Sequence, residues 1–384
     1  MADEWFEQLF GFQEESGDAA AWARTRARFT HDPANNTLLC PNGATYAAGP
    51  FSTPSLAELR AQAAALLAQR PPGPTTLTHA VTDGVLPLHA QRPGATFLAA
   101  SGLNCLEFAG PANTPEDGIT GYVYDNTQGP SCALACAAGT VVRNYFAANS
   151  PAAQVNLLED LGAALGAQHG AAFAVRNGYV SAPGGAAGLV ALGAGPLAEG
   201  SRTREALRAT LRVGLQRDTQ VTLATRFAPP PAPAPRVSQV YAAALSLGGY
   251  GDASIPDAAW APLATLVLEA AYESTLLAAL LASPPGVRPT VYLSGLGMGV
   301  FGNPAAWVAA AIARAVRVLR GMGAELDVVV MHFRKISVGF RADIDRAVPW
   351  PMEALVRGAC AAPPPPPRPW LCRAAQHWRA QPSS

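Results

Sequence analysis

The stretch VYLSGLGMGVFGNPAAWVAAAIARAVRVLR, residues 291–320, decides the fold, because it reads as a strand, a tight turn and a helix in immediate succession. A strand is predicted over Thr290–Leu293, whose β-branched and aromatic residues suit a buried position in a mostly parallel sheet. The helix is predicted to begin with Asn303 as N-cap and Pro304 as first residue, and to end near Gly321. One solvent-facing stripe of arginines is expected on it: Arg314, Arg317 and Arg320.

The turn between strand and helix is rich in glycine. Four residues without a Cβ can adopt positive φ there and let backbone N–H groups approach an anion: Gly295, Gly297, Gly299 and Gly302. The N-terminus of the following helix adds partial positive charge, so the combination predicts a phosphate site. The same turn is also typical of a helix packed tightly on a sheet, and glycine spacing alone does not decide between the two. The spacing matches neither the P-loop nor the dinucleotide fingerprint.

Length and composition bound the class of protein. A chain of 384 residues with 49% hydrophobic residues can bury a large core, as one large domain or two. Charged residues make up 14% and the formal net charge is zero, which gives no electrostatic reason to expect a nucleic acid or a membrane as partner. No basic, apolar leader begins the chain, and glycines and a proline interrupt the apolar run at 289–313. A cytoplasmic location is therefore expected.

The cysteines suggest buried, reduced thiols. Six are present, and Cys105, Cys132 and Cys136 lie inside apolar stretches. Cys132 and Cys136 could share a helix face, but no His or Cys pair at zinc spacing completes a site. Neither a metal nor a cofactor is expected.

Strand and helix patterns alternate along the chain. This alternation favours an α/β fold of three layers, with a mixed, mostly parallel central sheet flanked by helices. Residues 1–72 are predicted to form an N-terminal cap of helix, hairpin and helix, and residues 73–345 the main ligand-binding domain. Residues 346–384 are Pro-rich and expected to be disordered.

Two further segments carry expectations about packing. Residues 75–91 are expected to form an irregular or helical connection. Glu269 and Glu273 stand four positions apart in a predicted long helix over 260–281, where such a pair usually marks a solvated face.

A second informative stretch covers residues 96–146. Thr96–Ala100 is predicted as a buried strand, and the polar residues after it lie where α/β folds bind ligands. Four carboxylates cluster in this otherwise charge-poor span: Glu107, Glu116, Asp117 and Asp125. Hydrolysis of a glycosidic bond needs carboxylates to orient water, accept its proton or stabilise an oxocarbenium-like centre.

Each of these acids also has a structural interpretation. TPED at 114–117 is typical of a helix N-terminus, with Thr114 as cap and the acids favoured by the dipole. On that pattern alone, capping and chemistry are equally good accounts of Glu116 and Asp117. Asp125 could form an Asx turn. Glu107, flanked by two apolar residues, should need a partner.

With both stretches in view, GVFGNP at 299–304 resembles the diphosphate-binding loop of macrodomains. Further motifs resemble a divergent branch of that superfamily, near poly(ADP-ribose) glycohydrolase-like and arginine-type ADP-ribosyl hydrolases: NxLE at 104–107, TPEDGIT at 114–120, YDNTQGP at 124–130, AGTxxRNYF at 138–146, SQVY at 238–241 and LVLEAAYE at 266–273. The Gly-Gly-Gly and Glu-Glu signature of poly(ADP-ribose) glycohydrolases is absent, so cleavage of poly(ADP-ribose) chains is not expected.

The resemblance implies a macrodomain-like fold that binds ADP-ribose or an ADP-ribosylated protein. It also implies removal of ADP-ribose from modified side chains, arginine among them, by water directed onto the anomeric carbon of the distal ribose. Asp117 and Asp125 would be the catalytic carboxylates, with Glu116 in support. The expected ligand-binding residues are Asn104, Glu107, Gly297, Met298, Gly299, Val300, Phe301, Gly302 and Asn303. The alternative is a non-catalytic module that binds ADP-ribose or a related nucleotide.

Overall fold

The computed structural model describes residues 4–147, 149–150, 152–248, 250–284 and 286–348. Almost all of them belong to one compact unit, Met1–Ala347. The second unit, Val348–Ser384, falls outside the described residues after Val348. The prediction of disorder for 346–384 therefore falls outside the described residues from residue 349 onward.

A seven-stranded sheet forms the centre of the compact unit, in the order β4-β9-β10-β6-β11-β12-β5. The five strands from β10 to β5 run parallel, and β9 joins them antiparallel, followed by β4 at the edge. The prediction of a mixed, mostly parallel sheet is confirmed. The strands are β4 (Phe51–Ser52), β5 (Thr75–Thr82), β6 (Thr96–Ala100), β9 (Gly214–Gln220), β10 (Arg236–Ala242), β11 (Thr290–Leu293) and β12 (Leu326–Phe333).

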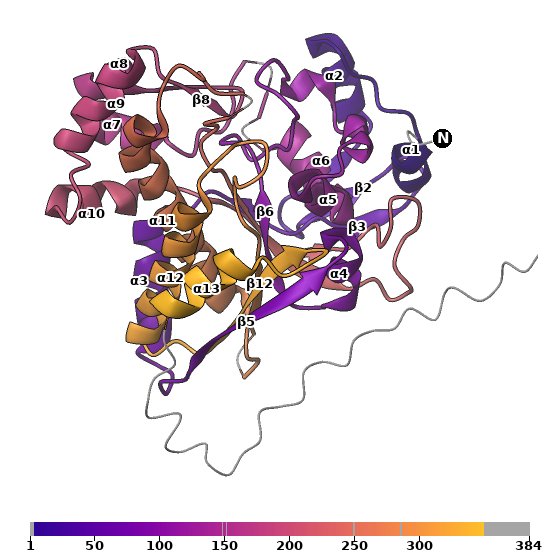
Figure 1. Cartoon of the computed structure of the whole chain (residues 1–384). Coiled ribbons are helices and arrows are strands. Elements are labelled where there is room, and N and C mark those ends of the chain that lie inside the picture. Colours follow the sequence, from indigo (N-terminus) through magenta and orange to yellow (C-terminus); the bar gives the residue numbers. More distant parts are fainter. Residues whose placement is uncertain (1–3, 148, 151, 249, 285, 349–384) are drawn as a thin grey trace, which may run out of the picture. The chain divides into compact units, whose positions relative to one another are not determined.

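Helices flank this sheet on both sides, as predicted for three layers (Figure 1). One group comprises α3 (Leu56–Leu67), α11 (Asp257–Ala282), α12 (Ala305–Gly321) and α13 (Val338–Ala347), and the other α4 (Val85–Gln91), α5 (Gln128–Ala135) and α6 (Ala137–Tyr145). The remaining elements are 3-10 helices η1 (Pro115–Asp117) and η2 (Thr120–Tyr124), helices α7 (Glu159–Leu165), α8 (Ala167–Ala172), α9 (Gly185–Ala194) and α10 (Arg202–Thr210), and the hairpin of β7 (Ala174–Arg176) and β8 (Tyr179–Ser181).

Helix α11 is the long core helix that the sequence pattern predicted. By length and composition it could cross a membrane, but 89% of its most apolar window is buried inside the protein, and it packs against α12, α3 and α9. A core helix that is apolar on all sides needs such cover.

The strand–turn–helix prediction for residues 290–321 holds in its strand and differs in its helix. Helix α12 begins at Ala305, and Pro304 occupies the N-cap position without a side-chain cap. Asn303 does not cap the helix: its Oδ1 has no hydrogen-bond partner among the described residues, and its Nδ2 donates to the carbonyl of Leu245 at 2.7 Å. The expected solvent-facing arginine stripe is present only at exposed Arg317: Arg314 is paired with buried Glu273, and the Arg320 guanidinium donates to the carbonyl of Thr75.

The edge strand β5 was missed in the sequence. β5 occupies residues that were expected to form an irregular or helical connection, and only α4 fits that expectation. β5 is an edge strand, so its threonines and His79 alternate weakly between core and solvent. An edge strand of this kind lacks the continuous apolar run of a central parallel strand, which explains the miss.

The solvated face expected for Glu269 and Glu273 was also wrong. The Glu273 side chain is fully buried and accepts hydrogen bonds from Arg60 at 2.6 and 3.0 Å. Glu269 accepts from Arg204 at 2.7 Å and from Arg208 at 2.8 Å. The two glutamates therefore hold α3, α10 and α12 onto α11.

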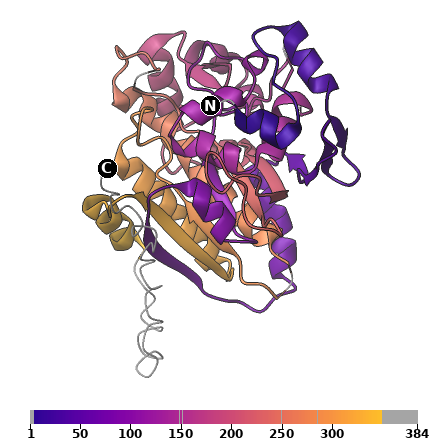
Figure 2. The same cartoon turned by 90° about the vertical axis from the view of Figure 1, so that its right-hand side faces the viewer.

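The N-terminal segment adds a small cap, shown in indigo in Figure 2. Helices α1 (Glu4–Phe10) and α2 (Ala19–Ala27) accompany a three-stranded sheet of β1 (Thr30–Asp32), β2 (Thr37–Leu39) and β3 (Thr45–Ala47). The predicted hairpin at Asn42-Gly43 joins β2 to β3. Glu14 ties this cap to the main sheet's loops, since its carboxylate accepts from the backbone N–H of Ile119 and Thr120 and from the Tyr145 hydroxyl.

Candidate functional site

A pocket opens where β6, β10 and β11 end. Its empty volume is about 910 Å³, which includes the open mouth. Carboxyl ends of parallel strands are the usual place for a ligand in an α/β sheet. The lining consists of residues 100–102, 107–109, 125, 127–130, 179, 244, 250, 294–297 and 299–301.

The glycine-rich loop after β11 forms one wall of this pocket. Gly297 and Gly302 adopt φ values of +74° and +70°, and a Cβ on Gly297 would lie 2.4 Å from the Cβ of Ala244. Only glycine fits this loop at those two positions. Among the described residues, four of its backbone N–H groups have no hydrogen-bond partner: those of Gly297, Gly299, Val300 and Phe301. Such a run of free N–H groups suits an anion.

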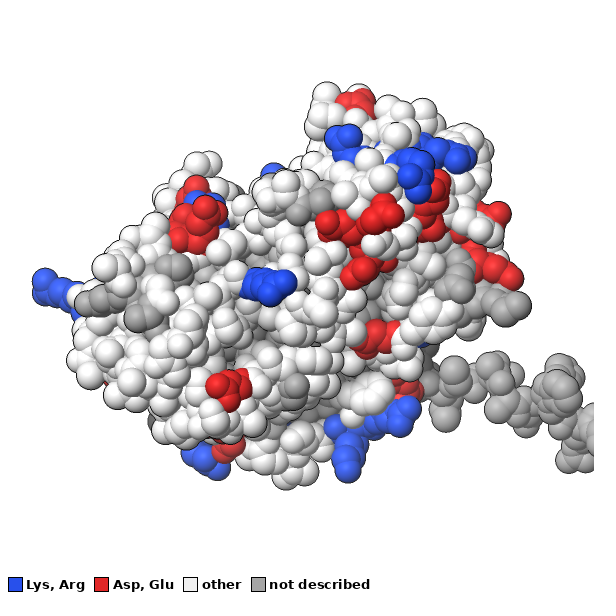
Figure 3. Space-filling view, turned by 90° about the horizontal axis from the view of Figure 1, so that it is seen from above, with Lys and Arg blue, Asp and Glu red and all other residues white. Residues whose placement is uncertain are grey.

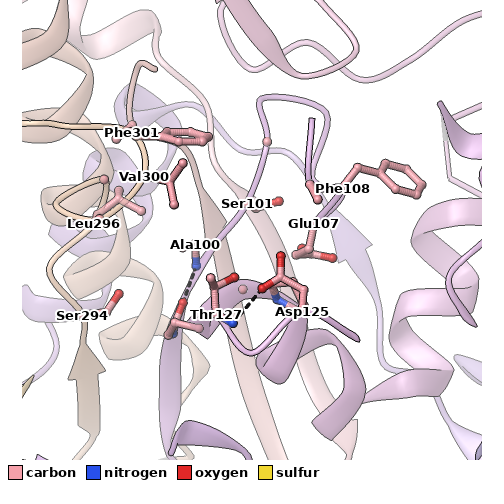
Figure 4. A pocket seen from close by; sticks show the side chains of 18 of the residues that line it. Ala100, Ser101, Glu107, Phe108, Asp125, Thr127, Ser294, Leu296, Val300 and Phe301 are labelled. Atoms are coloured by element: carbon pink, nitrogen blue, oxygen red, sulfur yellow. Dashed lines mark hydrogen bonds between the residues drawn. The ribbon is translucent and has the colours of Figure 1, made fainter. Parts of the chain in front are cut away.

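The predicted loop residues divide into two groups. Gly297, Gly299, Val300 and Phe301 line the pocket, as Figure 4 shows for the last two. The others are outside the lining: Met298, Gly302 and Asn303. Asn303 instead fixes the loop from behind, because its backbone N–H donates to the carbonyl of Gly297 at 2.9 Å.

Three aromatic rings meet beside this loop. Phe301 lies 5.7 Å from Tyr179 and 6.2 Å from Tyr250, and the two tyrosines are 5.6 Å apart between ring centroids. The Tyr179 hydroxyl donates to the carbonyl of Phe108 at 2.8 Å. The trio offers an apolar surface against which a sugar or a base can pack.

Glu107 lies on the opposite wall. The charged partner that was predicted from its apolar sequence neighbours is present, and it is Arg143. Arg143 Nη1 lies 2.9 Å from Oε1 and 3.0 Å from Oε2 of Glu107, and both side chains are fully buried. The guanidinium also lies 3.7 Å above the ring of Tyr241. Burial raises the pKa of Glu107, and the positive charge of Arg143 acts in the opposite direction.

Asp125 is the second carboxylate of the lining. Its Oδ1 accepts from the Thr127 backbone N–H at 2.7 Å, so the Asx turn considered from the sequence is present. Arg226 Nη2 donates to the Asp125 carbonyl at 2.9 Å. Figure 4 shows Asp125 and Glu107 on one side of the pocket, across from Leu296, Val300 and Phe301.

The start of α5 also lines the pocket. Gln128 bridges this helix to β6, accepting from the Ala100 N–H at 2.7 Å and donating to the Leu98 carbonyl at 2.6 Å. A Cβ on Gly129 would lie 1.9 Å from the Ala100 carbonyl oxygen, so the helix start packs directly on the strand end.

Three predicted site residues lie elsewhere. Asp117 is exposed, and its Oδ2 accepts from the Thr114 N–H and from Asn113 at 3.0 Å, which is the capping arrangement. Glu116 is half-buried beside it and does not line the pocket. Asn104 is buried, donating to Gln154 at 2.7 Å and accepting from the Leu106 N–H at 3.2 Å. The structure brings together Glu107, Asp125 and the loop, but not these three.

Several lining residues escaped sequence reasoning. Tyr179, Tyr250 and Ser294 come from a hairpin, a loop and a strand end that are far apart in the chain. Gln128 and Gly129 lay inside the motif YDNTQGP, whose Gln-Gly-Pro could have pointed to a helix start at a strand end. The lining contains no Lys, Arg or His. No cluster of three or more possible metal ligands occurs among the described residues.

The chain is thus an α/β protein with a pocket at the carboxyl ends of its parallel strands. No family model and no curated protein matches the chain. Similar solved structures include poly(ADP-ribose) glycohydrolase from Deinococcus radiodurans in complex with ADP-ribose, with 16% identity, 79% of this chain and 95% of that chain covered, and a TM-score of 0.42. The enzyme from Thermomonospora curvata has 16% identity, 86% and 97% coverage and a TM-score of 0.39.

The same enzyme bound to the inhibitor ADP-HPD gives a TM-score of 0.38, with 16% identity, 85% of this chain and 97% of that chain covered. The chain is therefore similar in structure to bacterial poly(ADP-ribose) glycohydrolases at low sequence identity. The function is therefore inferred from the residues that line the pocket of this chain.

Proposed function

We propose that the pocket binds ADP-ribose and that the protein is an ADP-ribosyl hydrolase, which removes ADP-ribose from modified protein side chains. One observation carries the proposal: a single pocket joins a wall of free backbone N–H groups to a wall with two carboxylates. The first suits a diphosphate and the second suits chemistry on a sugar.

The binding mode follows from these walls. The N–H groups of residues 297 and 299–301 hold the diphosphate, and Phe301 with Tyr179 and Tyr250 packs against a ribose. Phosphates are repelled by carboxylates, so the anionic part stays on the loop side. The distal ribose then extends toward Asp125 and Glu107.

Asp125 is the better placed catalytic group. Its Oδ1 is held by the Thr127 N–H, which leaves Oδ2 to accept a proton from water as that water attacks the anomeric carbon. The new bond joins the water oxygen to that carbon, the bond to the side chain breaks, and the side chain leaves with its electron pair and takes up a proton. The Glu107 side chain is fully buried and held by Arg143, so its charge acts on the ribose end of the pocket without direct contact.

A binding module without turnover is the second candidate function. The observation that favours it is the state of Glu107, whose carboxylate is already engaged by buried Arg143. That leaves one accessible carboxylate, whereas most glycoside hydrolases use two. Turnover by the protein on ADP-ribosylated substrates distinguishes the two candidates.

Calorimetric titration with ADP-ribose is the first test. Gly299 carries no positive φ, and a Cβ there meets nothing within 4 Å, so Gly299→Ala should bind as the parent does. Gly299→Glu places a negative charge beside the diphosphate and should abolish measurable binding. If the parent binds no ADP-ribose, or if Gly299→Glu binds it equally well, the proposed function is wrong.

A further inference from the structure

Ser294, the residue directly after β11, carries a hydroxyl that the protein itself does not use. Its Oγ is buried and has no hydrogen-bond partner among the described residues. Ser294 also lines the pocket, and Figure 4 shows it at the tip of the strand, on the same side as Leu296 and Val300. Buried polar atoms without a partner are uncommon in native proteins, and each one calls for an explanation.

The position of this serine is firmly fixed. The Tyr272 hydroxyl, from α11, donates to the Ser294 carbonyl at 2.8 Å and accepts from the Leu296 N–H at 2.9 Å. The Leu296 N–H also lies 3.0 Å from the Ser294 carbonyl oxygen. The free hydroxyl is therefore part of an ordered strand end.

Gln128, another polar residue of the lining, shows the contrast. Gln128 uses its amide fully, with Ala100, Leu98 and Cys132 as partners. Ser294 thus keeps a free hydroxyl donor in the same lining as the free N–H groups of 297 and 299–301.

The charge of the lining narrows the chemistry that this hydroxyl can serve. Because the lining holds no cationic side chain, a diphosphate there can be met only by neutral donors. A serine hydroxyl in the same lining as free backbone N–H groups is such a donor. We infer that Ser294 is a further ligand-binding residue, which donates a hydrogen bond to a phosphate oxygen of the diphosphate. This inference rests on the proposed function, because it assigns a partner within the same pocket.

The expected signature combines two measurements. Replacing Ser294 by Ala removes a buried hydroxyl that has no protein partner, so the free protein should melt at the same or a higher temperature. The same change should weaken binding about 10- to 100-fold, as expected for a hydrogen bond to a charged group.

Ser246 supplies a matched control. Its hydroxyl is also buried without a partner among the described residues, but Ser246 does not line the pocket. Ser294→Ala and Ser246→Ala are compared with the parent by calorimetry using ADP-ribose, ADP and inorganic pyrophosphate. Ser294→Ala should weaken all three by a similar factor, and Ser246→Ala none.

Each other outcome has a defined meaning. Unchanged affinity in Ser294→Ala, or equal losses in both variants, overturns the inference. A loss with ADP-ribose alone places the hydroxyl on the distal ribose and overturns the phosphate assignment. If the parent binds ADP and pyrophosphate but not ADP-ribose, and Ser294→Ala weakens those two, the inference stands while the proposed function falls. If the parent binds none of the three, both are wrong.

Discussion

Asp125 and Asp117 are eight positions apart and perform different tasks. Asp125 lines the pocket, whereas Asp117 holds the N–H of Thr114 at the start of η1. The resemblance implied catalysis for both, and the alternative of a helix cap was equally open for Asp117. The catalytic roles of Asp117 and Glu116 stay predictions, and the two aspartates can be compared directly.

If the protein is a hydrolase, Asp125→Asn should lower turnover about 10²- to 10⁴-fold, because it removes the proton acceptor and keeps the Oδ1 that Thr127 needs. ADP-ribose affinity should change little. Asp117→Asn likewise keeps an oxygen that can accept from the Thr114 N–H, so it should change the free energy of unfolding by less than about 0.5 kcal/mol, with turnover kept. Kinetics and urea titration of both variants check this. Lost turnover in Asp117→Asn at full stability would restore its catalytic role.

Single residues could be predicted where the signal lay within one short segment of the sequence. The loop glycines, Phe301 and the partner requirement of Glu107 followed from the sequence. Arg143 as that partner did not, because the contact joins two segments 36 positions apart. Ser294 was seen only as the end of a strand, since an unpartnered hydroxyl is a property of the packed structure.

At the scale of elements, a pair of histidines connects the sheet edge to α13. His79 Nδ1 of β5 lies 2.8 Å from His332 Nε2 of β12, and His79 Nε2 lies 3.1 Å from Asp345. The Ser337 N–H donates to His332 Nδ1 at 3.1 Å. The chain of bonds is complete only if both rings are neutral, with His332 Nε2 donating to His79 and His79 Nε2 donating to Asp345.

Acid should therefore weaken this edge. Burial lowers the pKa of both histidines. At His79, Arg341 lowers the pKa further and Asp345 raises it. At His332, the neighbouring His79 and Arg341 both lower the pKa further. A depressed folded-state pKa gives stability that is present above the unfolded value of 6.5 and is lost as pH falls below it. Urea unfolding at pH 7.5 and 5.5 should show a smaller loss in His332→Gln than in the parent.

Comparing the variant with the parent cancels the effects of acid on other groups. Burial lowers the pKa of His89 to about 4, which contributes to acid sensitivity in the same direction in both proteins. Only the difference between parent and variant reports on the edge pair. An equal pH dependence in the two proteins would contradict the role given to the histidines.

The carboxylate of Glu273 joins three helices and should be costly to lose. Arg60 of α3 and Arg314 of α12 both bind it, and the Glu273 side chain is fully buried. Glu273→Gln should lower the free energy of unfolding by about 3–5 kcal/mol, because it leaves charged partners incompletely paired. Glu15→Gln, which breaks the exposed pair with Arg24, should leave stability nearly unchanged. Chemical denaturation of both variants measures the contrast.

At the scale of the whole molecule, charge is sparse. The formal net charge is zero, and Figure 3 shows Asp and Glu gathered on one side of a face whose other side is largely uncharged. The pocket itself is lined by two carboxylates and no cationic side chain. Its affinity for an anion must come from short-range dipoles and not from long-range attraction.

Salt should therefore not weaken binding of ADP-ribose. Between 50 and 500 mM salt the dissociation constant should change less than about threefold, and any trend should be toward tighter binding, as repulsion from the carboxylates is screened. Titrations at several salt concentrations check this. A steep loss of affinity with salt would mean that a cationic side chain meets the phosphates.

The whole-molecule architecture was predictable where periodicity was strong. The central strands β6, β10 and β11 and the helices α3, α11 and α12 followed from apolar runs, caps and glycines. The edge strand β5 did not, because an edge strand exposes part of each face. Nor did the buried ion pairs on α11, since spacing within one helix says nothing of the arginines that other elements bring to it.

Gly129 has a consequence for the redesign of this pocket. With the Ala100 carbonyl oxygen 1.9 Å from the place of a Cβ, no single substitution at 129 can add a side chain without moving the strand end. An acid or base at position 129 itself is therefore not accessible by a single substitution. Another reactive group is better introduced at exposed Thr127, two positions earlier, which is the N-cap residue of α5.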